Sequence, residues 1–158
     1  MDRLEFKVPR DILMKSKLLH ETRGERTFVL VFDSGDEVMS VLTRFAKENG
    51  LSGARFTAIG AFQKATLGYF DWSKKDYKRN PVSEQVEVVS LVGDIAEDEK
   101  GQPKVHAHAV IGKSDGAALG GHLLDAIVRP TLELMLTESP VHLHRKYDDA
   151  SGLALIRL

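Results

Sequence analysis

Residues 104–123 read KVHAHAVIGKSDGAALGGHL and contain three of the six histidines of the chain. The first eight of these residues, Lys104–Ile111, favour a strand, and the glycine-rich residues that follow are typical of a turn. Residues that face each other in an antiparallel hairpin have a constant index sum. A turn centred on Asp115 gives a sum of 230, which is also 108 + 122. The pattern therefore predicts that His122 faces His108, provided that the register is not shifted by half a residue.

This hairpin predicts a metal site. His106 and His108 are two positions apart in the expected strand, so both imidazoles project from the same face. With His122 opposite, three neutral imidazoles form a ligand set for Zn²⁺ or another divalent transition metal. Three protein ligands leave a further position for water, a substrate group or a residue from another subunit. A structural role for these histidines, or a non-metal small ligand, fits the same spacing.

Two carboxylates are candidate companions of this site, and two further histidines repeat its spacing. Glu133 lies on the opposite face of its predicted strand from the flanking leucines, and a carboxylate there suits an imidazole N–H. Glu133 and Glu87 are the candidates for orienting a histidine or for a general base. His142 and His144 repeat the His-x-His spacing without a third partner nearby in the sequence, which favours a structural reading.

The composition excludes several classes of protein. The chain has 158 residues, no cysteine and a formal net charge of −1. The length favours one domain, and the lack of cysteine excludes disulfides, thiol nucleophiles, iron–sulfur clusters and cysteine-based zinc fingers. Near-neutrality argues against binding of nucleic acid through bulk positive charge. A charged N-terminus and no apolar run longer than Phe28–Phe32 predict a cytoplasmic protein without a membrane segment.

The rest of the chain predicts an α+β fold. Only residues 37–49 have a helical pattern, with apolar residues at spacings of three and four and capping side chains in residues 33–36. Strands are expected at residues 15–21, 26–32, 54–59, 65–70, 84–92, 104–111, after 121, and at 131–137 and 153–157, with Gly60 among the turn residues. We expect one or two helices packed on a curved, mostly antiparallel sheet. Residues 1–14 are expected to form an N-terminal arm and residues 15–158 the domain.

A basic stretch beside an aromatic residue is the best candidate for contact with nucleic acid. Lys74, Lys75, Lys78 and Arg79 follow Trp72, and basic residues mixed with aromatic ones can contact phosphates and stack on bases. The near-neutral charge of the chain favours a solvated hydrophilic loop instead.

Several segments resemble the plants-and-prokaryotes conserved domain, abbreviated PPC or PCC, in order and spacing. The histidine strand, Gly120-Gly121-His122 and Pro130-Thr131-Leu132-Glu133 carry the resemblance, which covers residues 15–158. It implies the stand-alone prokaryotic type, an α+β domain with a curved antiparallel sheet that forms homotrimers. In some members, histidines that match His106, His108 and His122 bind a metal. Plant members join the domain to AT-hook DNA-binding segments, and this sequence contains no AT-hook.

Three functions remain as hypotheses from the sequence. The first is a homotrimeric module that binds a metal or small ligand through the three histidines. The second is a DNA-binding or transcription-associated protein that acts with DNA or a regulatory partner. The third is a metal-dependent hydrolase or lyase, in which a metal lowers the pKa of a bound water. No settled reaction accompanies the resemblance, and we favour the first hypothesis.

Overall fold

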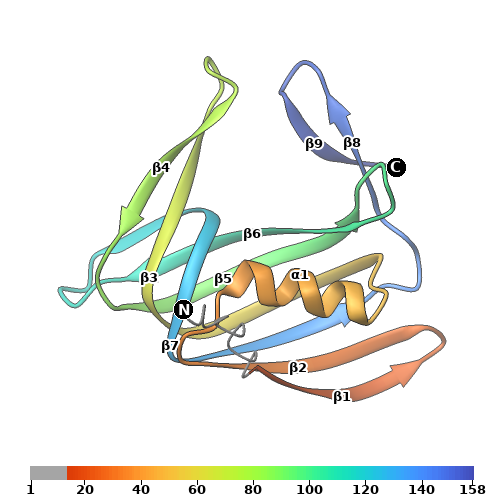
Figure 1. Ribbon diagram of the computed structural model, residues 1–158, viewed down its shortest axis with the longest axis horizontal. Coiled ribbons are helices and arrows are strands. Elements are labelled where there is room, and N and C mark those ends of the chain that lie inside the picture. Colours follow the sequence, from red (N-terminus) through yellow and green to blue (C-terminus); the bar gives the residue numbers. More distant parts are fainter. Residues whose placement is uncertain (1–13) are drawn as a thin grey trace, which may run out of the picture.

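The computed structural model describes residues 14–158 as one curved β-sheet with a single helix among these residues (Figure 1). The strands are β1 (Lys15–Thr22), β2 (Glu25–Asp33), β3 (Gly53–Asp71), β4 (Asp76–Val82), β5 (Val86–Glu97), β6 (Pro103–Gly112), β7 (Ala118–Glu138), β8 (His144–Asp148) and β9 (Leu153–Arg157). The predicted fold class is confirmed. The predicted N-terminal arm, residues 1–14, lies outside the described residues except for Met14.

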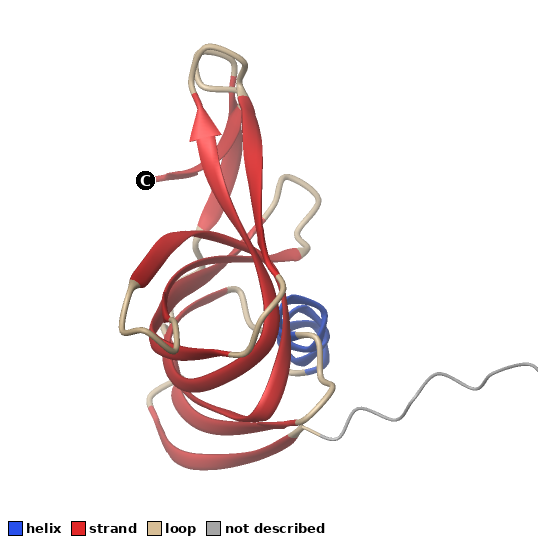
Figure 2. Ribbon diagram, turned by 90° about the vertical axis from the view of Figure 1, so that its left-hand side faces the viewer, coloured by secondary structure: helices blue, strands red, loops and turns tan. Residues whose placement is uncertain are grey.

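The sheet curls because the long strand β7 pairs with β2, β3 and β6. Its order is β1-β2-β7-β3-β5-β8-β9, with β4 paired to β3 and β6 paired to both β5 and β7. The pairings β3–β5, β5–β6, β6–β7 and β7–β3 therefore close a ring of strands, which Figure 2 shows nearly end-on. All pairings between the described strands are antiparallel except that of β5 with β8.

Two long strands replace pairs of short strands that the sequence predicted. β3 runs through Gly60, which is a bend within the strand and not a turn, and the register with β5 shifts between Ala58 and Gly60. A Cβ atom at Gly60 would lie 2.3 Å from the carbonyl oxygen of Thr131, and φ there is +152°, so the bend requires glycine. In the same way, β7 joins the piece after Gly121 to residues 131–137.

The helix α1 (Val38–Glu48) closely matches its predicted range and packs its apolar stripe into the core, with Leu42 fully buried. Its cap differs from the prediction of residues 33–36. The carboxylate of Glu37 accepts hydrogen bonds from the backbone N–H groups of Met39 and Ser40, at 3.2 and 2.7 Å. It also accepts one from the N–H of Ala126 on β7 at 3.2 Å, so one side chain both caps the helix and joins it to the sheet.

The core lies between α1 and the inner face of the curved sheet. Its largest fully buried side chains come mainly from β2, β3, β5, β6, β7 and the helix: Phe32, Phe62, Leu30, Leu42, Leu51, Leu91, Ile95, Ile111, Leu123, Leu132, Leu134 and Leu136. The helix has 11 residues and is not long and apolar enough to cross a membrane.

The packing of α1 predicts that substitutions on its buried and exposed faces change the free energy of unfolding by different amounts. Leu42→Ala is expected to lower the free energy of unfolding by about 2–5 kcal/mol, because it opens a cavity at a fully buried position. Arg44→Ala, on the exposed face, is expected to change it by less than about 0.5 kcal/mol. Urea unfolding followed by circular dichroism measures both, and equal effects would contradict this packing.

Candidate metal centre

The hairpin of β6 and β7 pairs His108 with His122, and this confirms the register predicted from the index sum. The pairing continues from Ala109 with Gly121 to Gly112 with Ala118 without a shift. Gly121 also lies against β3, since a Cβ atom there would be 2.8 Å from the carbonyl oxygen of Gly68. The glycine beside His122 thus lets β7 approach β3 closely while β7 remains paired with β6.

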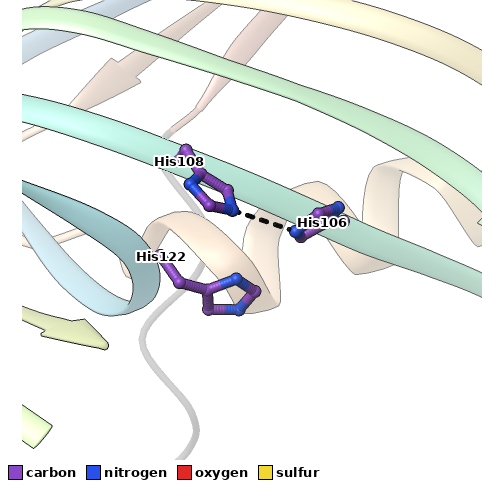
Figure 3. A group of neighbouring side chains, drawn as sticks. All are labelled: His106, His108 and His122. Carbon is purple, nitrogen blue, oxygen red and sulfur yellow. Dashed lines mark hydrogen bonds between the residues drawn. The ribbon is translucent and has the colours of Figure 1, made fainter. Parts of the chain in front are cut away.

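The side chains of His106, His108 and His122, which we term the three-histidine cluster, point toward one another (Figure 3). The Nε2 atoms of His106 and His108 are 3.2 Å apart, and one ring nitrogen from each of the three residues lies within 4.8 Å of the others. Two nitrogens bound to a tetrahedral zinc ion at about 2.1 Å are about 3.4 Å apart. The spacing of the donors is therefore compatible with a metal site.

Asp94 and Arg145 support the cluster from the side facing β5 and β8. Nδ1 of His106 lies 3.4 Å from a carboxylate oxygen of Asp94, and Arg145 donates a hydrogen bond to the same carboxylate. The guanidinium of Arg145 lies equally close to this Nδ1 atom, at 3.4 Å, so both an acceptor and a donor face it. Burial raises the pKa of Asp94, but the hydrogen bonds from His106 and Arg145 outweigh it and lower that pKa overall.

The sequence did not predict Asp94 and Arg145 as parts of the site. Asp94 had a signal in the sequence, because the turn between β5 and β6 is centred on Lys100 and gives an index sum of 200, which is also 94 + 106. The structure pairs Asp94 with His106. Arg145 lies on β8, a short charged strand that has no apolar alternation to reveal it.

The surroundings of the cluster lower the pKa values of two of its histidines. Burial, followed by the influence of His106, His108 and Arg145, lowers the pKa of His122 to about 4. Burial and the neighbouring His106 also lower the pKa of His108. Both rings are therefore neutral at pH 7, the form that binds metals. Nδ1 of His122 is buried and has no hydrogen-bond partner among the described residues, so it is a polar atom that the protein alone leaves unsatisfied.

A cavity of about 300 Å³ adjoins the cluster. His106, His122 and Arg145 line one part of it, and residues of β4, β6 and β9 complete it: Tyr77, Lys104, Val105, Leu153, Ala154 and Leu155, together with Asp98. The ring of Tyr77 lies 4.7 Å from that of His122, measured between centroids, and burial raises the pKa of its phenol. The cavity therefore brings Tyr77 and two of the histidines to one space of the size of a small ligand.

The two predicted carboxylates lie away from the cluster within one chain. Glu133 is exposed on β7 opposite Ile59 of β3, three strand spacings or about 14 Å across the sheet from β6. Glu87 is exposed and pairs with Gly112, four residues or about 13 Å along β6 from His108. The structure brings neither of them to the histidines of its own chain.

The four basic residues that are candidates for contact with nucleic acid lie on the hairpin of β3 and β4: Lys74, Lys75, Lys78 and Arg79. Two of them, Lys78 and Arg79, belong to β4, where a loop was expected. Several of these cations already have partners. Lys74 lies 3.6 Å from Asp71, Arg79 lies 2.8 Å from Asp125, and Lys75 donates to the backbone carbonyl of Asp149 at 2.9 Å. This last contact joins the tips of the β3–β4 and β8–β9 hairpins.

Comparison with known families agrees with this fold. A model of the Plants and Prokaryotes Conserved (PCC) domain matches residues 19–140. The chain belongs to this family. The PCC match includes the whole three-histidine cluster and Asp94, and it ends before His142 and Arg145.

Solved structures of similar proteins support the assignment. A plant- and prokaryote-conserved protein from Pyrococcus horikoshii is 33% identical, with a TM-score of 0.79, covering 84% of this chain and 92% of that one. A metal-containing protein from Archaeoglobus fulgidus is 30% identical, with a TM-score of 0.77, covering 92% and 99%. A “putative DNA binding protein” from Bacteroides thetaiotaomicron is 28% identical, with a TM-score of 0.82, covering 91% and 96%. Comparison with curated proteins finds no match.

The position of Asp94 beside His106 predicts that loss of this carboxylate weakens the binding of metal by the cluster. Asp94→Asn is expected to weaken Zn²⁺ binding by the cluster about 10- to 100-fold, because a neutral amide no longer offsets the positive charge of Arg145 beside His106. Glu87→Gln, a matched change about 13 Å away, is expected to leave the affinity unchanged. Competition with a chromophoric chelator measures both, and equal affinities for Asp94→Asn and the unmodified protein would contradict this role.

Proposed function

We propose that this protein is a homotrimeric PCC module that binds a divalent transition metal, Zn²⁺ above all, through His106, His108 and His122. The observation that carries the proposal is the pairing of His108 with His122, since it gathers the three imidazoles with donor spacings suited to one ion. A metal at this site would act as a Lewis acid toward a ligand in the adjoining cavity. The similar Archaeoglobus fulgidus protein, which is described as metal-containing, supports the proposal.

The trimer is supported by the face of the sheet that carries the histidines. The pairings place Met135, Thr57, Val92 and His108 side by side in one row across β7, β3, β5 and β6. Several apolar side chains on this part of the sheet are exposed: Ile59 by 62%, Val92 by 48% and Met135 by 45%. A continuous exposed apolar surface is typical of a protein interface. We infer that copies of the chain meet through this face, next to the three-histidine cluster.

This arrangement also gives Glu133 a place in the proposal. Glu133 is paired with Ile59 and is exposed on the same face. In the trimer, Glu133 of a neighbouring subunit would be the carboxylate available to the histidines, whereas β3 and β5 separate that of the same chain from β6. We therefore propose together that the protein binds Zn²⁺, that it forms a trimer, and that it is located in the cytoplasm, as expected from the sequence.

A DNA-associated regulatory function is the second candidate. The similar proteins from Bacteroides thetaiotaomicron and Ralstonia eutropha, each described as a “putative DNA-binding protein”, favour it. The charge of the chain weighs against direct binding, since the net charge is −1 and Lys74 and Arg79 are paired with carboxylates. A metal-dependent hydrolase or lyase is the third candidate. Two carboxylates of the same chain lie near the cluster, and both have other partners. Asp94 accepts a hydrogen bond from Arg145, and Asp98 accepts hydrogen bonds from the backbone N–H groups of Lys100 and Gln102, so neither is free to serve as general base.

Loss of any cluster histidine is expected to remove the tightest metal site. His106→Ala, His108→Ala and His122→Ala should each abolish the highest-affinity Zn²⁺ equivalent in a calorimetric titration, because two imidazoles alone hold the ion far less tightly. His20→Ala, at an exposed position on β1, is the matched control and should titrate like the unmodified protein. Retention of that equivalent in any two of the three variants would overturn the site.

The proposed interface predicts the effect of charge on assembly. Ile59→Glu combined with Met135→Glu should shift the mass in solution from a trimer to a monomer, because it places carboxylates in an apolar contact. Lys47→Glu, on the exposed face of α1, should leave the mass unchanged. Sedimentation equilibrium measures all three proteins, and a trimer that survives the double substitution would contradict this interface.

A further inference from the structure

A second group of metal-binding side chains lies where β5 meets β8. Glu97 is the last residue of β5, His144 is the first residue of β8, and His142 precedes it by two positions. One ligand atom from each of these three residues lies within 4.8 Å of the others, and none of them belongs to the three-histidine cluster. The proposed function of the cluster makes no use of them.

The backbone fixes this group in place. The N–H of Glu97 donates to the carbonyl of Leu143 at 2.8 Å, and the N–H of Leu143 donates to the carbonyl of Ser52 at 3.0 Å. Leu143 also packs closely against Gly53, where a Cβ atom would lie 3.3 Å from its side chain. The residue between the two histidines is thus held by β3 and β5, and both imidazoles are positioned over the Glu97 carboxylate.

The distances are those of donors around an ion. Nδ1 of His142 and Nδ1 of His144 lie 3.6 and 3.5 Å from the same carboxylate oxygen, Oε2 of Glu97. Both distances exceed the range of a normal N–H···O hydrogen bond. They match the separation of about 3.4 Å between two donors that share a tetrahedral ion at about 2.0–2.1 Å. A carboxylate oxygen at this spacing from two imidazole nitrogens is compatible with all three groups binding one cation.

The exposure of these side chains indicates a weaker site than the cluster. His142 and His144 are 64% and 62% exposed, whereas the Glu97 side chain is 18% exposed. Exposed imidazoles lose rotamer freedom when they bind an ion, which lowers the affinity. Two imidazoles and one carboxylate are also the ligand set of several catalytic zinc sites, in which water fills the open position.

We propose that Glu97, His142 and His144 form a second, independent site for a divalent transition metal, with open positions for water. The two sites share the β5–β8 junction, since Asp94 and Glu97 both lie on β5, and Arg145 and His144 both lie on β8. Both histidines of the second site follow the end of the PCC match at residue 140, whereas Glu97 lies within it.

Titration of the full chain with Zn²⁺ separates the two sites. The unmodified protein is expected to bind two equivalents per chain with different affinities. The double variant His142→Ala/His144→Ala should lose the weaker equivalent and keep the tighter one, and His106→Ala should do the reverse. Glu97→Gln, which preserves the size of the side chain, should weaken the second equivalent by at least about tenfold. His20→Ala is the control for the loss of a single exposed imidazole.

The outcomes distinguish this proposal from that of the cluster. A single equivalent that only His106→Ala removes would overturn the second site and leave the three-histidine cluster standing. Unchanged titration of both Glu97→Gln and the double variant would overturn it as well. If the double variant fails to fold by circular dichroism, Glu97→Gln and the NMR signals of the His142 and His144 imidazoles in the His106→Ala variant decide the question. That variant lacks the tighter site, so broadening of these signals by sub-stoichiometric Mn²⁺ or Co²⁺ reports the second site alone. Signals that stay sharp would then overturn the site.

Discussion

The pairing of His108 with His122 across the β6–β7 hairpin is the constraint on which the candidate site depends. A shift by one residue would turn one imidazole to the opposite face of the sheet and leave only the i, i+2 pair together. The register is secured on both sides of the site, because β7 pairs with β3 as well as with β6 and β6 pairs with β5. The closed ring of strands thus converts a sequence spacing into a fixed arrangement of three nitrogens.

The supporting residues follow from the same geometry. Pairing of β5 with β6 sets Asp94 opposite His106, and Arg145 on β8 holds that carboxylate in turn. Burial keeps His122 neutral, with a pKa of about 4, and leaves its Nδ1 atom without a partner among the described residues. The neutral and partly unsatisfied cluster beside an apolar face is the physical basis for proposing both a metal and an assembly of several chains.

Sequence reasoning succeeded where a short turn fixed the register, and it was less successful over longer distances. The helix, the fold class and the facing of His108 and His122 could be predicted from local patterns. The same arithmetic, applied to the β5–β6 turn, places Asp94 opposite His106, whereas the composition of that segment alone gives no sign of the contact. Arg145 and the third ligand of the His142 and His144 pair, Glu97, depend on β5 pairing with β8, which no local pattern indicates. Tyr77 likewise reaches His122 only because β3 and β4 form a long hairpin with a charged sequence.

The central claim is that one ion binds three imidazoles of one chain. A crystal of the zinc-loaded protein, measured at the zinc absorption edge, tests it most directly. The account predicts an anomalous peak about 2.0–2.1 Å from a ring nitrogen of each of His106, His108 and His122. A peak bonded to only one or two of them, or zinc bound elsewhere with no peak at this cluster, would contradict it.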